Sequence, residues 1–204
     1  MSMGRRREFD TDEALTRALG VFWDRGYEAT SIEDLTAATG LSRSSIYSTF
    51  GSKRGLFDAV MGHYLEGIGE ILGPLEEGEG GIDDLLRFFE MWRDRTRTDV
   101  DGSLGCLMIN TMAERGHVDP DIAELGSHYL TRFRSAFERA LEAAAERGEV
   151  RATAISQMAG TLMLTTTGFF VASRGQSRQR IEEMMDTIVS HVESLRVPTD
   201  GTEQ

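Results

Sequence analysis

The sequence is poor in the features that cross-link or anchor a protein. It has one cysteine, Cys106, so no internal disulfide and no Cys-based zinc finger can form, and a reducing compartment suits it. No stretch reaches eighteen uncharged apolar residues, which argues against a membrane-spanning helix. Residues 1–8 run straight into charge without the apolar region of a signal peptide. We therefore expect a cytoplasmic protein without a membrane partner.

Basic residues are also scarce. The chain has 22 Lys and Arg against 34 Asp and Glu, a formal net charge of −12, which disfavours binding to phosphates. However, residues 1–55 carry eight basic and eight acidic side chains, so the whole deficit lies in the rest of the chain. This asymmetry predicts two parts with different partners.

Prolines occur only at positions 74, 120 and 198, and no segment alternates apolar and polar residues over the length of a strand. The apolar residues instead follow a helical period, which predicts an all-α protein of about nine helices. We expect Asp10 with Glu13, and Thr30 with Glu33, to form capping boxes. The expected helices lie at 10–26, 30–40, 42–50, 52–72, 82–98, 104–115, 119–147, 153–173 and 177–195, with a loop at 73–81.

Residues 30–50 predict a helix-turn-helix motif, two short helices joined by a turn at Gly40. A small core between them would contain Ile32, Leu35, Leu41, Ile46 and Phe50. In such a motif the second helix enters the major groove of DNA, and its outward side chains would be Arg43, Ser44, Tyr47 and Ser48. Any helical hairpin with a glycine turn would show this pattern, so the motif alone leaves a purely structural role open.

The flanking residues carry a more specific signal. Over roughly residues 9–65 the sequence resembles the amino-terminal domain of the TetR family of transcriptional repressors. The motifs that carry the resemblance are Gly26-Tyr27, Ala29-Thr30, Gly40-Leu41-Ser42, Ile46-Tyr47 and Phe50-Gly51-Ser52-Lys53. The resemblance implies an N-terminal three-helix DNA-binding domain at 1–52 and a C-terminal helical ligand-binding and dimerisation domain at 53–204, connected through the fourth helix.

The same resemblance assigns roles to residues of the motif. It implies base contacts from Arg43, Ser44, Tyr47 and Ser48, and phosphate contacts from Thr30, Ser31, Ser42, Ser45, Thr49 and Lys53. The role of Lys53 also follows from its place at the positive end of a helix. Residues 5–7, three arginines, are either a solvated tail or an arm that contacts DNA.

The C-terminal part predicts a homodimer. Residues 154–173 are too apolar for a surface helix of a monomer, and the last helix carries a matching apolar stripe. The candidate interface residues are Leu162, Phe170, Met184, Ile188, Val192 and Leu195. The alternative is that both faces pack inside one chain.

The resemblance further implies a pocket for a small-molecule effector of unknown identity. Its candidate lining is rich in methionine and aromatic residues and comprises Met61, Tyr64, Phe88, Trp92, Met108, Met112, Tyr129, Phe133, Met163 and Phe169. The alternative for each of these residues is a place in the core.

Cys106 opens the segment Gly105-Cys106-Leu107, which resembles a branch of the family, and some branches use a cysteine as a redox or electrophile sensor. The alternative is a small buried hydrophobic residue. The histidines at 63, 117, 128 and 191 are widely spaced, so we predict no metal site and no cofactor.

These features predict a DNA-binding transcriptional regulator that responds to a ligand, a repressor released from a near-palindromic operator by a small molecule. One alternative is a helical protein-interaction module that does not bind DNA specifically. A helical enzyme is the other, but the sequence shows no glycine-rich phosphate loop, paired metal carboxylates or nucleophile elbow. We therefore expect no enzymatic activity.

Overall fold

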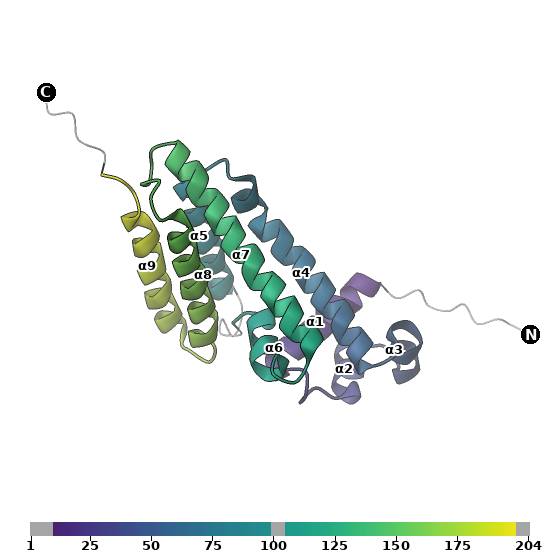
Figure 1. Ribbon diagram of the computed structural model, residues 1–204. Helices are drawn as coiled ribbons and strands as arrows, with labels where there is room; N and C mark the ends of the chain where they lie inside the picture. Colours follow the sequence, from purple (N-terminus) through teal and green to yellow (C-terminus); the bar gives the residue numbers. More distant parts are fainter. Residues whose placement is uncertain (1–9, 99–104, 199–204) are drawn as a thin grey trace, which may run out of the picture. The chain divides into compact units, whose positions relative to one another are not determined.

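A computed structural model describes residues 10–98 and 105–198, without the side chains of 96–98. This part of the chain contains nine α-helices and no strand, which confirms the expected fold class (Figure 1). The helices are α1 (Thr11–Arg25), α2 (Ile32–Thr39), α3 (Arg43–Phe50), α4 (Lys53–Glu77), α5 (Ile82–Thr98), α6 (Leu107–Arg115), α7 (Pro120–Glu146), α8 (Ile155–Ala172) and α9 (Arg178–Ser194).

The chain divides into two compact units, 1–68 and 69–204. Helix α4 therefore contributes its first part to the N-terminal unit and its second part to the C-terminal unit. The boundary between the units lies inside this helix, further along the chain than the predicted limit at 52/53.

The N-terminal unit is built around aromatic and aliphatic side chains from all four of its helices. Phe22 of α1 packs edge-on against Phe57 of α4, with ring centroids 5.1 Å apart. Leu35 of α2 and Ile46 of α3 are fully buried and complete this core. Burying a side chain of this size stabilises the fold by about 1.5–3 kcal/mol, so the two short helices depend on the core for their stability.

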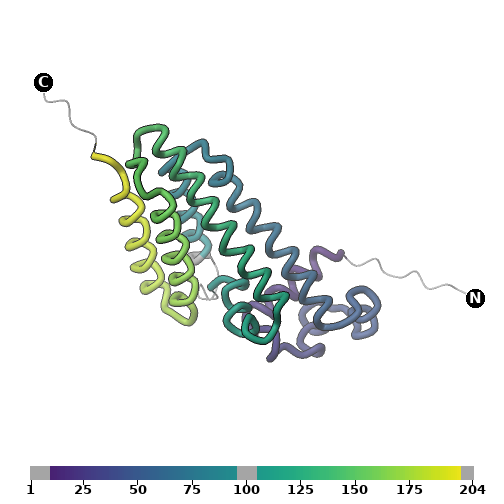
Figure 2. Tube along the Cα trace, viewed as in Figure 1, coloured from purple at the N-terminus to yellow at the C-terminus, as the bar shows by residue number. Residues whose placement is uncertain are grey.

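The C-terminal unit is a helical bundle in which α7 packs against α8 and α5 packs against α9. The views in Figures 1 and 2 show α7, α8 and α9 as neighbouring helices in this unit. A cluster of phenylalanine rings fills the space between α5 and α7. Phe88 lies 5.5 Å from Phe137 and 6.0 Å from Phe133, measured between ring centroids. Edge-to-face contacts of this kind add to the stabilisation from burial.

The loop that we predicted at 73–81 is wrong in its first half, because α4 continues through Pro74. Proline lacks the N–H group that an interior helical residue donates, and this usually ends a helix. Here the helical turn after Pro74 is stabilised by the packing of Leu75, which is almost fully buried. The backbone N–H of Gly78 donates to the carbonyl of Pro74 at 3.2 Å and closes the last turn.

Two helix starts also differ from the prediction. Helix α8 begins at Ile155 after Ala154, which has a left-handed φ of 63° and no side-chain oxygen to cap the helix. Helix α6 begins at Leu107, and the predicted start at Leu104 lies outside the described residues. In the part of the chain that the structure describes, no helix is long and apolar enough to cross a membrane.

Candidate DNA-binding surface

The first helix of the motif is capped one residue later than predicted. The hydroxyl of Ser31 accepts a hydrogen bond from the backbone N–H of Asp34 at 3.1 Å, and the Asp34 carboxylate accepts one from the backbone N–H of Ser31 at 2.9 Å. The predicted pair of Thr30 and Glu33 is wrong, because the Thr30 hydroxyl donates to the Gly26 carbonyl at 2.6 Å. The capping box therefore depends on Ser31 and Asp34.

The Asp34 carboxylate is also electrostatically stabilised. Hydrogen bonds from Ser31, assisted by the nearby charge of Arg25, lower the pKa of Asp34 below its ordinary value. The Arg25 guanidinium lies 2.5 Å from this carboxylate. Asp34 therefore remains a carboxylate at neutral pH, where it caps α2.

The turn between the helices has the geometry that we expected. Gly40 adopts the left-handed conformation, with φ 71° and ψ 5°, which glycine reaches without a steric penalty. Ser42 then caps α3 by accepting a hydrogen bond from the backbone N–H of Ser45 at 3.1 Å. Because Ile46 is completely buried, the opposite side of α3 is presented to the surface.

The outward side of α3 carries the residues predicted to contact bases. Arg43, Ser44, Tyr47 and Ser48 are all exposed, and Tyr47 is one of the few large exposed apolar residues of the described chain, at 44% exposure. These side chains can donate to and accept from base edges in a major groove.

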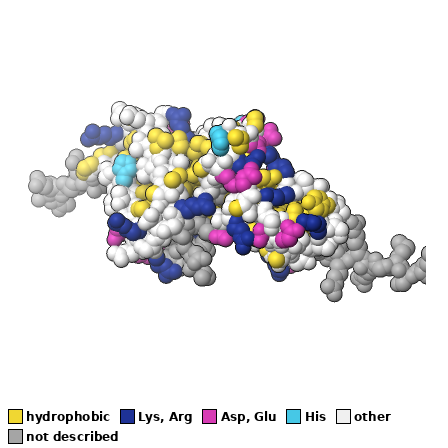
Figure 3. All heavy atoms as spheres, turned by 90° about the horizontal axis from the view of Figure 1, so that it is seen from below, with side chains coloured by type: hydrophobic (Ala, Val, Ile, Leu, Met, Phe, Trp, Pro, Cys, Tyr) yellow, Lys and Arg dark blue, Asp and Glu magenta, His cyan; other side chains and the backbone are white. Residues whose placement is uncertain are grey.

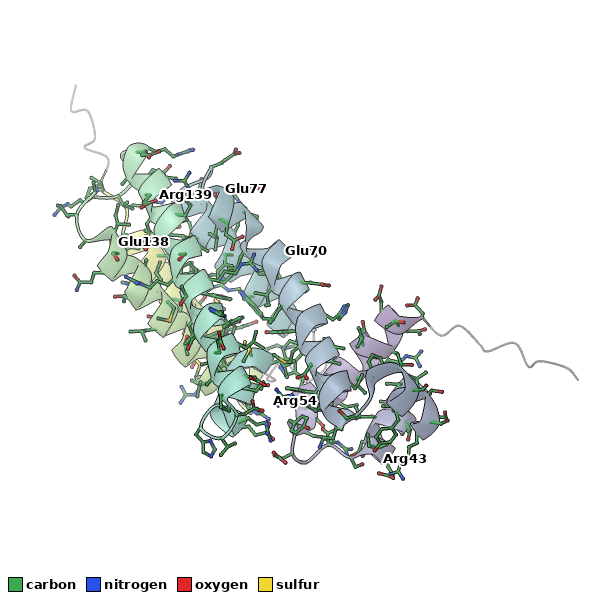
Figure 4. The ribbon with its side chains drawn as sticks, turned by 45° about the vertical axis from the view of Figure 1, so that its right-hand side comes forward. Arg43, Arg54, Glu70, Glu77, Glu138 and Arg139 are labelled. Atoms are coloured by element: carbon green, nitrogen blue, oxygen red, sulfur yellow. The ribbon has the colours of Figure 1, made fainter. Side chains whose placement is uncertain are left out.

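Glu33 forms an ion pair with the guanidinium of Arg43 across the turn. The Arg43 Nη2 lies 2.5 Å from the Glu33 Oε1, and both side chains are largely exposed, at 62% and 71%. Figure 4 shows Arg43 at the surface of this unit. An exposed pair of this kind is worth at most about 1 kcal/mol, so contact with DNA can replace it.

Lys53 lies at the start of α4, as predicted, and is oriented by an aromatic ring. Its Nζ lies 4.4 Å from the centroid of the Tyr27 ring and 3.5 Å from the carbonyl oxygen of Glu28. The Ser52 hydroxyl accepts from the backbone N–H of Gly55 at 3.0 Å and caps the helix. A Cβ on Gly55 would lie 1.9 Å from the Phe50 carbonyl oxygen, so only glycine allows α3 and α4 to approach this closely.

The remaining predicted phosphate contacts differ in their accessibility. Ser31, Ser42 and Thr49 are exposed and Ser45 is half-buried, whereas Thr30 is 1% exposed. The three arginines at 5–7 lie outside the described residues.

Sequence reasoning missed two contributors to this surface, Glu33 and Tyr27. Neither could be recognised from local spacing, because Glu33 contacts Arg43 across ten positions and Tyr27 contacts Lys53 across twenty-six.

On the face shown in Figure 3, basic and acidic side chains are interspersed and do not form one basic area.

Two family models match the chain. "Bacterial regulatory proteins, tetR family" matches residues 14–60, and "Tetracyclin repressor-like, C-terminal domain" matches residues 81–188. The chain belongs to the TetR family. The uncharacterized HTH-type transcriptional regulator YezE of Bacillus subtilis (strain 168) is 31% identical to this TetR-family chain over 191 residues, 92% of this chain and 98% of that protein.

Other relatives agree with this assignment. The HTH-type transcriptional repressor ComR of Escherichia coli (strain K12) is 36% identical over 123 residues, 60% of this chain and 59% of that protein. The regulator CifR, solved in complex with 26-bp operator DNA, is 25% identical with a TM-score of 0.74, over 91% of this chain and 98% of that one. The predictions of a TetR-family fold and of a DNA-binding transcriptional regulator are confirmed.

Most of the predicted ligand-binding residues of this TetR-family chain are buried. Met61 and Tyr64 belong to the N-terminal unit, and the other eight belong to the C-terminal unit. The half-buried members are Met112 and Met163. Tyr129 and Phe133 are in ring contact at 4.7 Å. A core and a pocket lining both require burial, so the ligand-binding set stays a prediction.

Most of the predicted dimer residues are buried within a single chain. These are Leu162, Phe170, Ile188 and Val192, whereas Met184 and Leu195 are half-buried. The surface of α8 instead exposes Leu164 and Val171, which are 67% and 59% exposed.

Cys106 is fully buried at the start of α6. Its Sγ lies 3.1 Å from the hydroxyl oxygen of Tyr129, which is also buried. Such a thiol has the environment of a small buried residue and lacks the access that rapid oxidation requires. Among the described residues, no group of three or more His, Cys, Asp or Glu side chains could hold a metal ion.

Proposed function

We propose that this TetR-family regulator is a homodimeric repressor that reads a near-palindromic operator with α3 and is released from it by a small molecule. The observation that carries the proposal is the outward face of α3, where Arg43, Ser44, Tyr47 and Ser48 are exposed around the buried Ile46. A homodimer presents two such faces related by a two-fold axis, and a two-fold operator matches them.

Each side chain on this face has a role that its chemistry supports. Arg43 can donate two hydrogen bonds to the O6 and N7 atoms of guanine, and the Tyr47 ring can contact a thymine methyl group. We expect Ser42 and Thr49, which are exposed, and Lys53, at the start of α4, to bind phosphate oxygens, with the positive dipole of the α4 N-terminus adding to the attraction. Phosphate contacts set the position of α3, and base contacts select the sequence.

The exposed side of α8 supports the homodimer. Thr161, Leu164, Gly168 and Val171 are spaced at three and four residues, so they share one side of the helix, and none of them is buried. Of the four large hydrophobic side chains that the described residues expose, two, Leu164 and Val171, lie on this side of α8. We assign this stripe to the contact between protomers.

The response to a small molecule is supported by the extent of α4. This helix belongs to both compact units, so a ligand that contacts its second part acts on an element shared with the DNA-binding unit. A ligand that prefers the form with low DNA affinity lowers operator binding, and the operator weakens ligand binding by the same factor. The regulator acts by binding and needs no catalytic group.

Selection from a pool of randomised duplexes tests this proposal. We expect enrichment of a sequence with two inverted half-sites about one helical turn, or a multiple, apart. Leu164→Glu should retain helicity but sediment as a monomer and lose the enrichment. A selection that enriches no sequence, while the protein sediments as a dimer, would favour the protein-interaction module instead.

A further inference from the structure

A groove of about 420 Å³ lies between α4 and α5 in the C-terminal unit. Its wall is mainly apolar and is formed by Ile71, Pro74, Leu75, Phe88 and Met91. Glu70, which Figure 4 labels on α4, lies at its edge. This volume lies in the range of small-molecule sites, and the wall suits a flat apolar ring.

The charged groups of the groove largely balance one another. Asp84 is buried, accepts a hydrogen bond from the backbone N–H of Gly80 at 2.6 Å and is paired with Arg87. Glu70 and Arg95 add one charge of each sign. The groove therefore carries no net charge that would select an ionic ligand.

Two side chains of the groove wall also contact Trp92. The Phe88 ring lies edge-on to the Trp92 ring at 6.4 Å between centroids, and the Arg95 guanidinium lies over the Trp92 ring at 5.5 Å from its centroid. On another side, Phe170 of α8 lies 4.8 Å from the Trp92 ring. Trp92 is therefore directly behind the wall of the groove.

Trp92 has an unused hydrogen-bond donor. The side chain is 6% exposed, and its Nε1 atom has no hydrogen-bond partner among the residues that the structure describes. A buried indole N–H normally finds an acceptor, because an unsatisfied buried donor destabilises the fold. The rings of Phe88 and Phe170 offer no carbonyl or hydroxyl oxygen to it. A bound molecule with an acceptor atom would satisfy this donor.

We propose that the α4–α5 groove binds an uncharged, flat ring compound with a carbonyl-type oxygen, and that this oxygen accepts a hydrogen bond from the indole N–H of Trp92. The ring packs against the groove wall beside Phe88. The Arg95 side chain lies over the Trp92 ring, so it has to move aside for the oxygen to reach the indole N–H. That this compound is the effector rests on the proposed function. Its binding to Trp92 does not.

The test uses acetophenone and α-methylstyrene, which differ only in that a C=CH2 group replaces the carbonyl. The full chain carries Trp23→Phe, so that Trp92 gives the single indole N–H signal in a ¹H–¹⁵N spectrum. We expect acetophenone to move this signal downfield and to bind roughly three- to tenfold more tightly than α-methylstyrene, the range that one neutral hydrogen bond provides. In the Trp23→Phe/Trp92→Phe protein, which retains an aromatic ring at position 92, this preference should disappear.

Three results would overturn the inference. One is an indole signal that acetophenone leaves unchanged, and another is equal affinity for the two compounds. A third is tighter binding of benzoate, which would make the arginines Arg87 and Arg95 the anchors. Anisotropy of the labelled operator in the same samples separates the two proposals. If the protein does not bind the operator but acetophenone still moves the indole signal, only the repressor proposal is contradicted. If the protein binds the operator but the indole signal does not move, only the proposed ligand class is contradicted.

Discussion

Replacing Arg43 by alanine should reduce operator affinity selectively, because Arg43 is the basic residue on the outward face of α3. We expect the selected operator to lose affinity while duplexes with a substituted guanine lose little. Lys53→Ala, in contrast, should weaken binding to all duplexes alike and reduce the slope of affinity against salt by about one phosphate contact.

The magnitude follows from the contacts of Arg43 in the free protein. A bidentate contact between arginine and guanine is worth about 1–3 kcal/mol. Forming it breaks the exposed pair with Glu33, which costs at most about 1 kcal/mol. Taking the middle of these ranges, the net loss in Arg43→Ala should be about 1–2 kcal/mol for each half-site, or roughly five- to thirtyfold in affinity per half-site.

The pair with Glu33 provides an internal check. Glu33→Gln frees Arg43 and removes a charge that repels phosphates, so operator affinity should rise by up to about fivefold at low salt. In an Arg43→Ala background most of this gain should vanish. Glu13→Gln is the matched control, since Glu13 forms a similarly exposed pair with Arg17 at 2.5 Å on α1.

Fluorescence anisotropy titrations at two salt concentrations, with the selected duplex and single-base variants, measure these changes. The reasoning is refuted if Arg43→Ala lowers the affinity for every duplex by the same factor. It is also refuted if Glu33→Gln changes operator affinity no more than Glu13→Gln does, or if the effect of Glu33→Gln is the same in the wild-type and Arg43→Ala backgrounds.

Three further results are expected. Leu164→Glu should give a folded monomer in sedimentation velocity, whereas Ile188→Glu should unfold the protomer in thermal circular dichroism, because a carboxylate at this buried position costs several kcal/mol. The pKa of Asp34 is lowered in the folded state, so its stabilisation exists above the ordinary value of 3.8 and is lost as the pH falls through the folded-state pKa. Urea unfolding of Asp34→Asn should therefore show a deficit at pH 7 that shrinks as the pH falls below 3.8. Cys106 should react with a disulfide reagent far more slowly in the native protein than in urea, and rapid native labelling would contradict its burial.

The helix-turn-helix motif could be predicted in detail because its determinants are local. Gly40 requires a left-handed turn and Ser42 caps the next helix, and both act within a few residues. Ile46 on the opposite side of a short helix then decides which residues face outward. The predicted N-cap of α2 was wrong by one residue. Thr30 and Ser31 have the same capping chemistry, and only the hydrogen bond from Thr30 to Gly26 shows that Ser31 is the cap.

The length of α4 could not be predicted from composition. Residues 73–81 contain the proline and glycines typical of a loop, yet tertiary burial of Leu75 keeps the helix intact past Pro74. Local propensity is a weak preference that packing can override.

The predicted dimer surface shows a related limit. An apolar stripe such as that of Ile188 and Val192 shows that a face is covered, but not whether the same chain or a second copy covers it. The fold shows that α5 packs against α9, and it leaves Leu164 and Val171 of α8 exposed. The ion pair between Glu33 and Arg43 could not be predicted from the sequence either, because it joins residues from two different helices.

Methylation interference on the selected duplex tests the central claim, that α3 reads the major groove of a two-fold operator, most directly. Methylating the N7 atom of a guanine blocks a contact from the major groove side. We predict interference at guanines in two symmetry-related positions, and loss of this interference in Arg43→Ala. Interference at one half-site only, or a pattern that Arg43→Ala leaves unchanged, would contradict the claim.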